Sequence, residues 1–218
     1  LRVVYLVFNE GYAAPAGGLA DEAIRLARLL HALLPEPEVL GLLALLLLHD
    51  ARRAARATAD GELIPLEEQD RTLWNRGAIA EGCALAEAAL SQHGFGAYAL
   101  QAAIAAVHGE AATAAETDWP QIVGLYDALL RLEPSPVIAL NRAVAVAMRD
   151  GPDSGLALVE PLLPLLPGYH AGPAAAADLC PRAGRLDDAC AHYRNAVALA
   201  RQEPERRFLQ RRLVEVGG

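Results

Sequence analysis

The stretch Gly184-Arg185-Leu186-Asp187-Asp188-Ala189, followed by Tyr193 and Ala196, constrains the fold of this chain more than any other feature. Glycine is favoured where a helix ends in a left-handed residue, so Gly184 predicts the end of one helix. Ala189 is small enough to let two helices approach closely, and Tyr193 and Ala196 continue a buried stripe at helical spacing. The pattern therefore predicts a turn followed by the second helix of an antiparallel helical hairpin.

Weaker copies of this pattern occur upstream. The matching residues are Tyr126, Leu130 and Pro134 in one copy and Ala139, Asn141, Gly151 and Ala157 in the next. Gly151 and Gly184 are 33 residues apart, which is close to the roughly 34-residue period of tetratricopeptide repeats. We therefore predict an all-α fold of stacked antiparallel helical hairpins, tetratricopeptide-like in the C-terminal half. An irregular helical bundle rich in alanine is the alternative.

The composition indicates a sizeable core built from small and aliphatic side chains. Hydrophobic residues make up 54% of the 218 residues and aromatic residues 5%, so Leu, Ala and Val must supply most of the core. The apolar stretch at residues 39–48 is shorter than the roughly 18 residues that span a bilayer, and the N-terminus lacks the pattern of a secretory signal. We expect a soluble, cytoplasmic protein without membrane contacts.

Helix start and stop signals divide the chain into about ten helices. Asp21 is expected to cap one of them, and Glu67 or Glu68 to open another. The middle of the helix at residues 38–56 is apolar on all sides, which predicts burial between neighbours, and Pro181 is expected to end its helix early. The expected helices cover residues 1–8, 21–34, 38–56, 67–90, 97–108, 119–132, 136–149, 153–166, 173–183, 186–200 and 204–216.

Six segments spread over nearly the whole chain form a recognisable combination. They are residues 5–12 (YLVFNEGY), 22–26 (EAIRL), 38–52 (ending in HDAR), 68–74 (EQDRTLW), 100–104 (LQAAI) and 139–145 (ALNRAVA). Together they resemble the C-terminal extension of a group of bacterial extracytoplasmic-function (ECF) sigma factors of RNA polymerase. In that family, sigma regions 2 and 4 come first, followed by a helical domain and then by tetratricopeptide-like repeats.

The resemblance implies a division of the chain into a helical domain at residues 1–95 and a repeat domain at residues 97–218. It also implies a regulatory, protein-interaction role in transcription initiation, with sigma regions 2 and 4 of the parent chain, RNA polymerase or a regulator as the partner. The chain lacks both sigma regions, and its sole methionine is Met148, so we expect further sequence before Leu1. A net charge of −8 argues against direct binding of nucleic acid by this part, because neutralising phosphates requires a positive surface.

The densest polar group combines the end of one expected helix with the start of another. Its members are His49, Asp50, Arg52 and Arg53 from the first helix and Glu67, Glu68, Asp70 and Arg71 from the second, and the candidate binding residues among them are His49, Asp50, Arg52, Asp70 and Arg71. An arginine can bind an anionic group through two parallel hydrogen bonds, so these residues could form the site of a small anionic ligand. A ligand-sensing domain is therefore the alternative function. The same charges could pair with each other and clamp the two helices, or contact a protein.

A second candidate surface includes Asn141 and Arg142, since tetratricopeptide scaffolds often use an inner-helix asparagine to hold a peptide backbone. Asn141 could equally bond a neighbouring helix. Catalytic and metal-binding motifs are lacking in the sequence, and the cysteines (Cys83, Cys180 and Cys190) lack metal-ligand spacing. We therefore expect neither an enzyme nor a cofactor or metal site.

Overall fold

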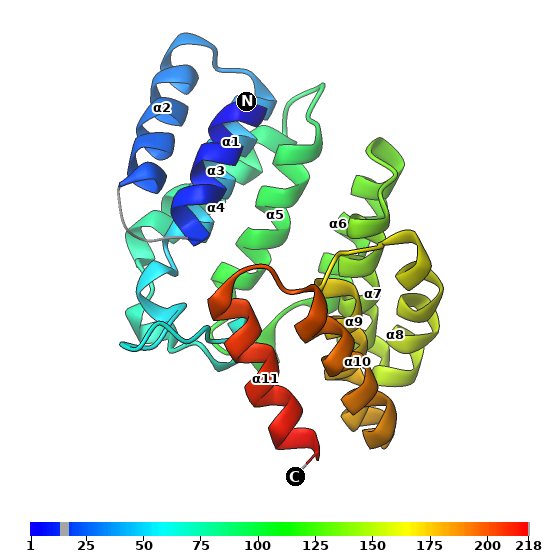
Figure 1. Ribbon diagram of the computed structural model, residues 1–218. Helices are drawn as coiled ribbons and strands as arrows, with labels where there is room; N and C mark the ends of the chain where they lie inside the picture. Colours follow the sequence, from blue (N-terminus) through cyan, green and yellow to red (C-terminus); the bar gives the residue numbers. More distant parts are fainter. Residues whose placement is uncertain (14–17, 218) are drawn as a thin grey trace. The chain divides into compact units, whose positions relative to one another are not determined.

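Helices account for nearly all regular structure in the computed structural model, which describes residues 1–13 and 18–217 (Figure 1). Over these residues the chain forms eleven α-helices and no β-strand, apart from an isolated antiparallel bridge between Ala57 and Leu63. The helices are α1 (Arg2–Ala13), α2 (Leu19–Leu33), α3 (Pro37–Asp50), α4 (Arg76–Leu90), α5 (Ala97–Glu110), α6 (Trp119–Leu132), α7 (Pro136–Asp150), α8 (Pro152–Val159), α9 (Ala171–Leu179), α10 (Leu186–Leu199) and α11 (Glu203–Gly217). The predicted all-α fold of stacked helical hairpins is confirmed.

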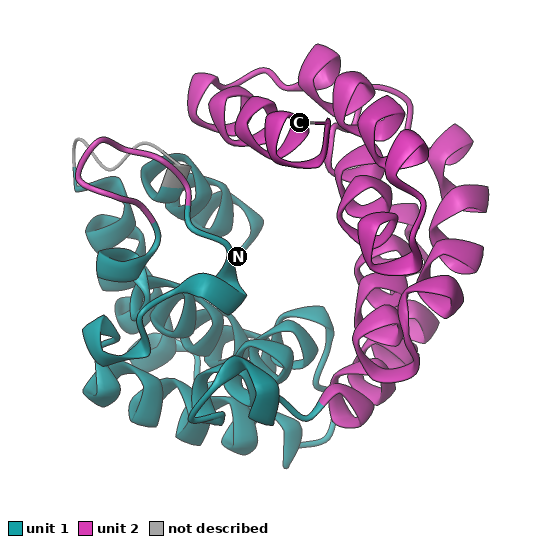
Figure 2. Cartoon of the chain, turned by 90° about the horizontal axis from the view of Figure 1, so that it is seen from below, with its two compact units in different colours: residues 1–56, 64–118 teal, residues 57–63, 119–218 magenta. Residues whose placement is uncertain are grey.

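Two compact units divide the chain (Figure 2). The first comprises Leu1–Arg56 and Ile64–Asp118, and the second comprises Ala57–Leu63 and Trp119–Gly218. The resemblance placed a boundary near residue 96, whereas the structure groups α5 with the first unit. The physical reason is that α5 packs against α3 and α4 along its apolar length.

Helix α3 forms the centre of the first unit. All its residues from Val39 to Leu48 are buried, as the apolar pattern predicts. Its Leu42 and Leu46 side chains pack with α1 and α2, whereas Ala44 and Leu45 pack with α4 and α5. Because neighbours cover α3 on all sides, the first unit depends on this one helix.

The carboxylate of Glu38, in the first turn of α3, caps the N-terminus of α5. It accepts hydrogen bonds from the backbone N–H groups of Gly96, Tyr98 and Ala99 at 2.9, 3.2 and 3.2 Å. The first N–H groups of a helix have no partner within the helix, and a negative charge there also interacts favourably with the helix dipole. Glu38 thus supplies a long-range cap.

Replacing Glu38 with glutamine is expected to lower the free energy of unfolding by about 1–2 kcal/mol, because it removes the charge and part of the capping capacity. Urea denaturation measures the change. Glu36→Gln is the matched control, since Glu36 is exposed and its side chain forms no cap, and it should shift the midpoint little. Equal midpoints for the two variants would contradict the capping role.

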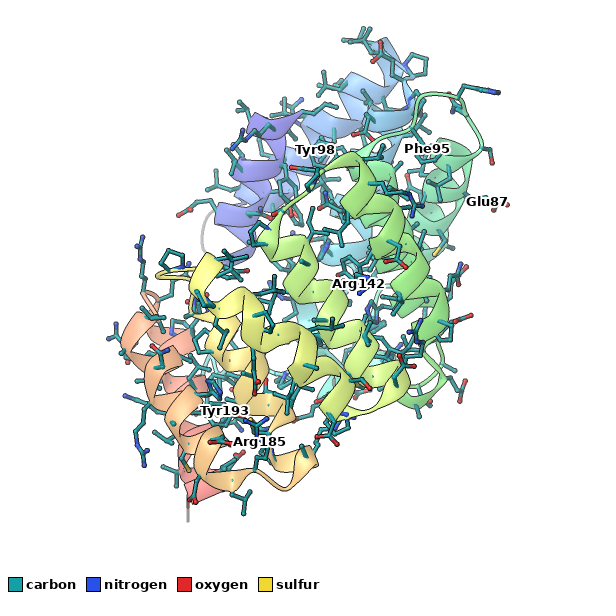
Figure 3. The ribbon with its side chains drawn as sticks, turned by 90° about the vertical axis from the view of Figure 1, so that its right-hand side faces the viewer. Glu87, Phe95, Tyr98, Arg142, Arg185 and Tyr193 are labelled. Carbon is teal, nitrogen blue, oxygen red and sulfur yellow. The ribbon has the colours of Figure 1, made fainter. Side chains whose placement is uncertain are left out.

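The second unit contains the predicted repeat hairpins. Gly184 adopts the left-handed conformation (φ 75°), and Ala189, Tyr193 and Ala196 are fully buried. The Tyr193 hydroxyl bonds Asp178 of α9 and accepts from Arg212 of α11, so this side chain, labelled in Figure 3, joins three consecutive helices. The prediction drawn from this motif is confirmed.

One repeat position differs from its sequence assignment. Ala157, which the pattern matched to the close-packed position, is exposed. The close approach occurs at Gly155, where an added Cβ would lie 2.3 Å from Ala147 Cβ of α7. The close-packed residue thus lies two positions before the assigned one, four residues after Gly151, whereas Ala189 lies five residues after Gly184.

Several expected helices are shorter than predicted. Helix α4 begins at Arg76 rather than at Glu67 or Glu68, because 3₁₀ turns at Leu66–Glu68 and Arg71–Leu73 precede it. Asn75 Oδ1 accepts from Ala78 N and fixes the start of α4. Asp21 lies in the first turn of α2 without capping it. The expected helices at residues 38–56, 153–166 and 173–183 each end in a 3₁₀ turn, the last at Pro181 as predicted.

Candidate functional site

Asp50, a member of the predicted polar group, forms a salt bridge with a neighbouring arginine. Arg53 Nη2 lies 2.5 Å from Asp50 Oδ1 and 2.7 Å from Asp21 Oδ1. This group joins the end of α3 to the first turn of α2, and the hydrogen bond with Arg53 is the main cause that lowers the pKa of Asp21. Asp50 thus acts in a clamp between two helices.

Asp70 is also engaged locally. Its Oδ1 accepts hydrogen bonds from Thr72 N at 2.8 Å and from Thr72 Oγ1 at 2.7 Å, which caps the 3₁₀ turn at Arg71–Leu73. These bonds lower the pKa of Asp70. The carboxylate is exposed and forms no salt bridge with the arginines next to it within the described residues.

Arg71 reaches the end of α5. Its Nη1 donates to the carbonyl oxygens of His108 and Ala111 at 2.8 and 2.6 Å, and its guanidinium carbon lies 4.4 Å from the centre of the Trp74 ring. Carbonyls in the last turn of a helix lack partners within the helix and carry partial negative charge. Arg71 therefore binds a helix C-terminus and stacks on an aromatic ring.

Arg56 binds a second helix C-terminus in the same manner. Its Nη1 donates to the carbonyl oxygen of Tyr12 at 2.7 Å, near the end of α1. Its guanidinium carbon lies 3.2 Å from the centre of the Tyr12 ring, a cation–π contact. The Tyr12 ring stands edge-on to the His49 ring, with the ring centres 5.7 Å apart.

Arg52 completes this group at the end of α3. Its Nη2 lies 3.1 Å from His49 Nδ1, and its guanidinium carbon lies 6.0 Å from the centre of the Trp74 ring. Trp74 itself is 3% exposed. We refer to Arg52, Arg56 and Arg71, with His49, His108 and Trp74, as the arginine cluster.

Burial and neighbouring positive charges keep both histidines of the arginine cluster neutral at pH 7. The pKa of His49 falls to about 3, first through burial and then through Arg52, Arg56 and His108. The pKa of His108 falls to about 4, through burial and then Arg52 and Arg71. Burial is also the main cause that lowers the pKa of Arg56 and of Arg71.

The structure thus brings together His49, Arg52 and Arg71 of the predicted group and leaves Asp50 and Asp70 outside it. Arg56, Trp74 and His108 were not predicted to belong to the site. The only sequence signal for these three residues is that each lies within a few residues of a helix end. The contacts of Arg71 with α5 join residues about 40 positions apart in the sequence, so a local pattern does not reveal them.

The other predicted surface lies on α7 of the second unit. Asn141 is exposed there, and Arg142, labelled in Figure 3, pairs with Asp127 of α6 through an Nε–Oδ1 contact of 2.5 Å. Arg142 therefore joins two helices of the stack. The side chain of Asn141 forms no hydrogen bond with the described part of the chain.

Across residues 1–13 and 18–217, no three His, Cys, Asp or Glu side chains converge in a way that could hold a metal ion. Over the same residues, every helix falls short of the length and apolar character needed to cross a bilayer.

Comparison with known proteins bears first on the N-terminal part. Residues 1–90 match the model of a family of unknown function (DUF6596). An uncharacterized protein of Rhizobium meliloti (strain 1021) is 47% identical to this chain, and the alignment covers 97% of this chain. The chain spans about half, 52%, of the length of this relative.

Proposed function

We propose that this chain is the regulatory, protein-interaction part of a bacterial ECF sigma factor and has no catalytic role. The observation that carries the proposal is the stack of helical hairpins in the second unit, which has the architecture that the resemblance implies. Repeat stacks of this kind present extended surfaces to other macromolecules. Transcription initiation takes place in the cytoplasm, where we accordingly place the chain.

Asn141 is the residue that we assign to the partner-binding surface of the stack. A carboxamide both donates and accepts hydrogen bonds, so it can pair with the backbone of an extended segment. Arg142 lies next to it but is held by Asp127. We therefore assign Arg142 a positioning role, which modifies the role that the sequence suggested for it.

The length of the Rhizobium meliloti relative supports the proposal, because about half of that protein lies outside the alignment with this chain. In a sigma factor of the expected type, regions 2 and 4 would occupy such a portion. The proposed partner of this chain is the corresponding portion of its own parent protein, which would contain sigma regions 2 and 4, or core RNA polymerase bound to that portion.

The proposal is tested on the Rhizobium meliloti relative, purified whole and without the segment aligned to this chain. The whole protein is expected to bind core RNA polymerase and to start transcription from a promoter. Removal of the aligned segment is expected to change the yield of transcript while polymerase binding persists. A whole protein that does not bind core RNA polymerase would rule out the sigma-factor role.

A second arm tests the binding surface on the chain itself. Asn141→Ala should weaken capture of a purified polypeptide containing sigma regions 2 and 4 about five- to tenfold, since one or two hydrogen bonds are lost. The melting temperature should stay nearly constant. Asn195→Ala, at an exposed position on α10, is the matched control, and equal capture by both variants would contradict the assignment of Asn141.

A further inference from the structure

The arginines of the first unit differ in their partners, and two exposed ones, Arg2 and Arg76, form no salt bridge with any described residue. Arg25, Arg28 and Arg53 are exposed, and each forms a salt bridge with a carboxylate. In contrast, the three half-buried arginines of the arginine cluster form no salt bridge with any described residue. Asp50 and Glu116 attract Arg56 and Arg71 only from beyond salt-bridge distance, so these half-buried charges have no directly paired carboxylate among the described residues.

The hydrogen bonds of the cluster leave many donors unused. Arg56 and Arg71 bond helix-end carbonyls through Nη1 alone, and Arg52 contacts His49 through Nη2 alone. A guanidinium has five N–H donors in a planar fork. The Nε–H of each arginine and further Nη–H groups therefore remain for a ligand.

Trp74 provides an independent observation. It is 3% exposed, and its Nε1 is a buried donor that has no hydrogen-bond partner among the described residues. Leaving a buried donor without a partner is unfavourable. The guanidinium groups of Arg52 and Arg71 lie against this same indole ring, so the unsatisfied donor and the unpaired charges occur together.

We propose that the arginine cluster binds a small phosphate-type oxyanion. Planar guanidinium forks match the geometry of phosphate oxygens and bind them in bidentate fashion. Partial burial strengthens the attraction, because the effective dielectric constant is lower than in water. The neutral imidazoles of His49 and His108 lie among these arginines without adding charge. The anion supplies a countercharge in direct contact with the arginines, which no described carboxylate does, and it links the ends of α1, α3 and α5.

Thermal unfolding in phosphate tests the site. About 10 mM inorganic phosphate, compared with chloride at the same ionic strength, is expected to raise the melting temperature by about 3–8 °C for a Kd of about 0.1–1 mM. A parallel arm with glycerol phosphate distinguishes free phosphate from a phosphate monoester, since only a site open enough for the ester responds to both. No rise with either compound would overturn the proposal.

Variants locate the effect. Arg52→Gln removes one charge, the contact with His49 and the distant contact with the Trp74 ring but no salt bridge, so it should fold and lose most of the phosphate response. Arg53→Gln, the adjacent control, loses the pairs with Asp21 and Asp50 but should keep the full response. An equal response in both variants would show that phosphate acts elsewhere.

Fluorescence provides a direct readout. Trp74 and Trp119 are the two tryptophans of the chain, so Trp119→Phe leaves Trp74 as the sole indole reporter beside the arginines. Its emission should change with phosphate along a saturable curve, and this change should disappear when Arg52→Gln is added. A linear, non-saturating change would contradict a defined site. The measurement involves no partner protein, so its outcome is independent of the proposed sigma-factor role.

Discussion

Replacing Gly41 with alanine is expected to lower the free energy of unfolding of the first unit by about 3 kcal/mol, which is the upper part of the range for overpacking. Gly41 lies in the buried middle of α3. A Cβ at this position would lie 2.4 Å from Ala99 N, 2.7 Å from Ala99 Cα and 2.8 Å from the carbonyl carbon of Tyr98. These are backbone atoms of α5, so the two helices must move apart, and no side chain can rotate away to make room.

Gly124→Ala is the matched control for this variant. Gly124 also lies inside a helix, α6, but an added Cβ would meet nothing within 4 Å. Alanine should therefore stabilise the protein there by about 0.5–1 kcal/mol, through helix propensity alone. Urea denaturation of both variants measures the contrast. A Gly41→Ala variant as stable as the original protein would show that α3 and α5 do not approach so closely.

Acidification from pH 7 to pH 5 is expected to destabilise the first unit by about 2 kcal/mol for each of His49 and His108. The folded-state pKa values of about 3 and 4 lie below the ordinary value of 6.5 that applies in the unfolded chain. Between these limits the unfolded state binds more protons than the folded state, so the free energy of unfolding falls as the pH falls. Carboxylates contribute little in this window, because their ordinary pKa values lie below it.

The measurement is chemical denaturation at several pH values in a buffer free of phosphate. His49→Gln should remove about half of the decline, since glutamine does not titrate and its oxygen can still accept from Arg52. His93→Gln is the control, because His93 is exposed in the connection between α4 and α5. A profile that is flattened equally by both replacements, or by neither, would contradict neutral burial of His49.

The repeat hairpins could be predicted because their signals are local. Gly184, Ala189 and Tyr193 lie within ten residues of one another, and each has a single mechanical role at that spacing. The same reasoning selected Ala157 where Gly155 makes the close contact, because a small shift in the turn changes which small residue faces α7. Local patterns thus predicted the elements, while packing decided the register.

The candidate site was predicted less well, since its contacts are made with backbone groups. The sequence shows that Arg71 follows Asp70, but not that Asp70 is engaged by Thr72 while Arg71 reaches the carbonyls at the end of α5. Helix-end carbonyls are present in every helix and have no sequence signature. Unpaired charge is likewise a property of the folded chain, because it depends on which carboxylates are absent nearby.

The cap that Glu38 places on α5 bears on where this chain can be cut. The family match ends at residue 90, within the last turn of α4, whereas the side chain of residue 38 bonds backbone groups at residues 96–99. A fragment ending at Leu90 would leave one flank of α3 facing water, including Leu40 and Leu45, which α5 covers in the intact chain. The residues that match the family model therefore leave out α5, which covers part of α3, and truncations aimed at isolating the N-terminal part should end after Asp118.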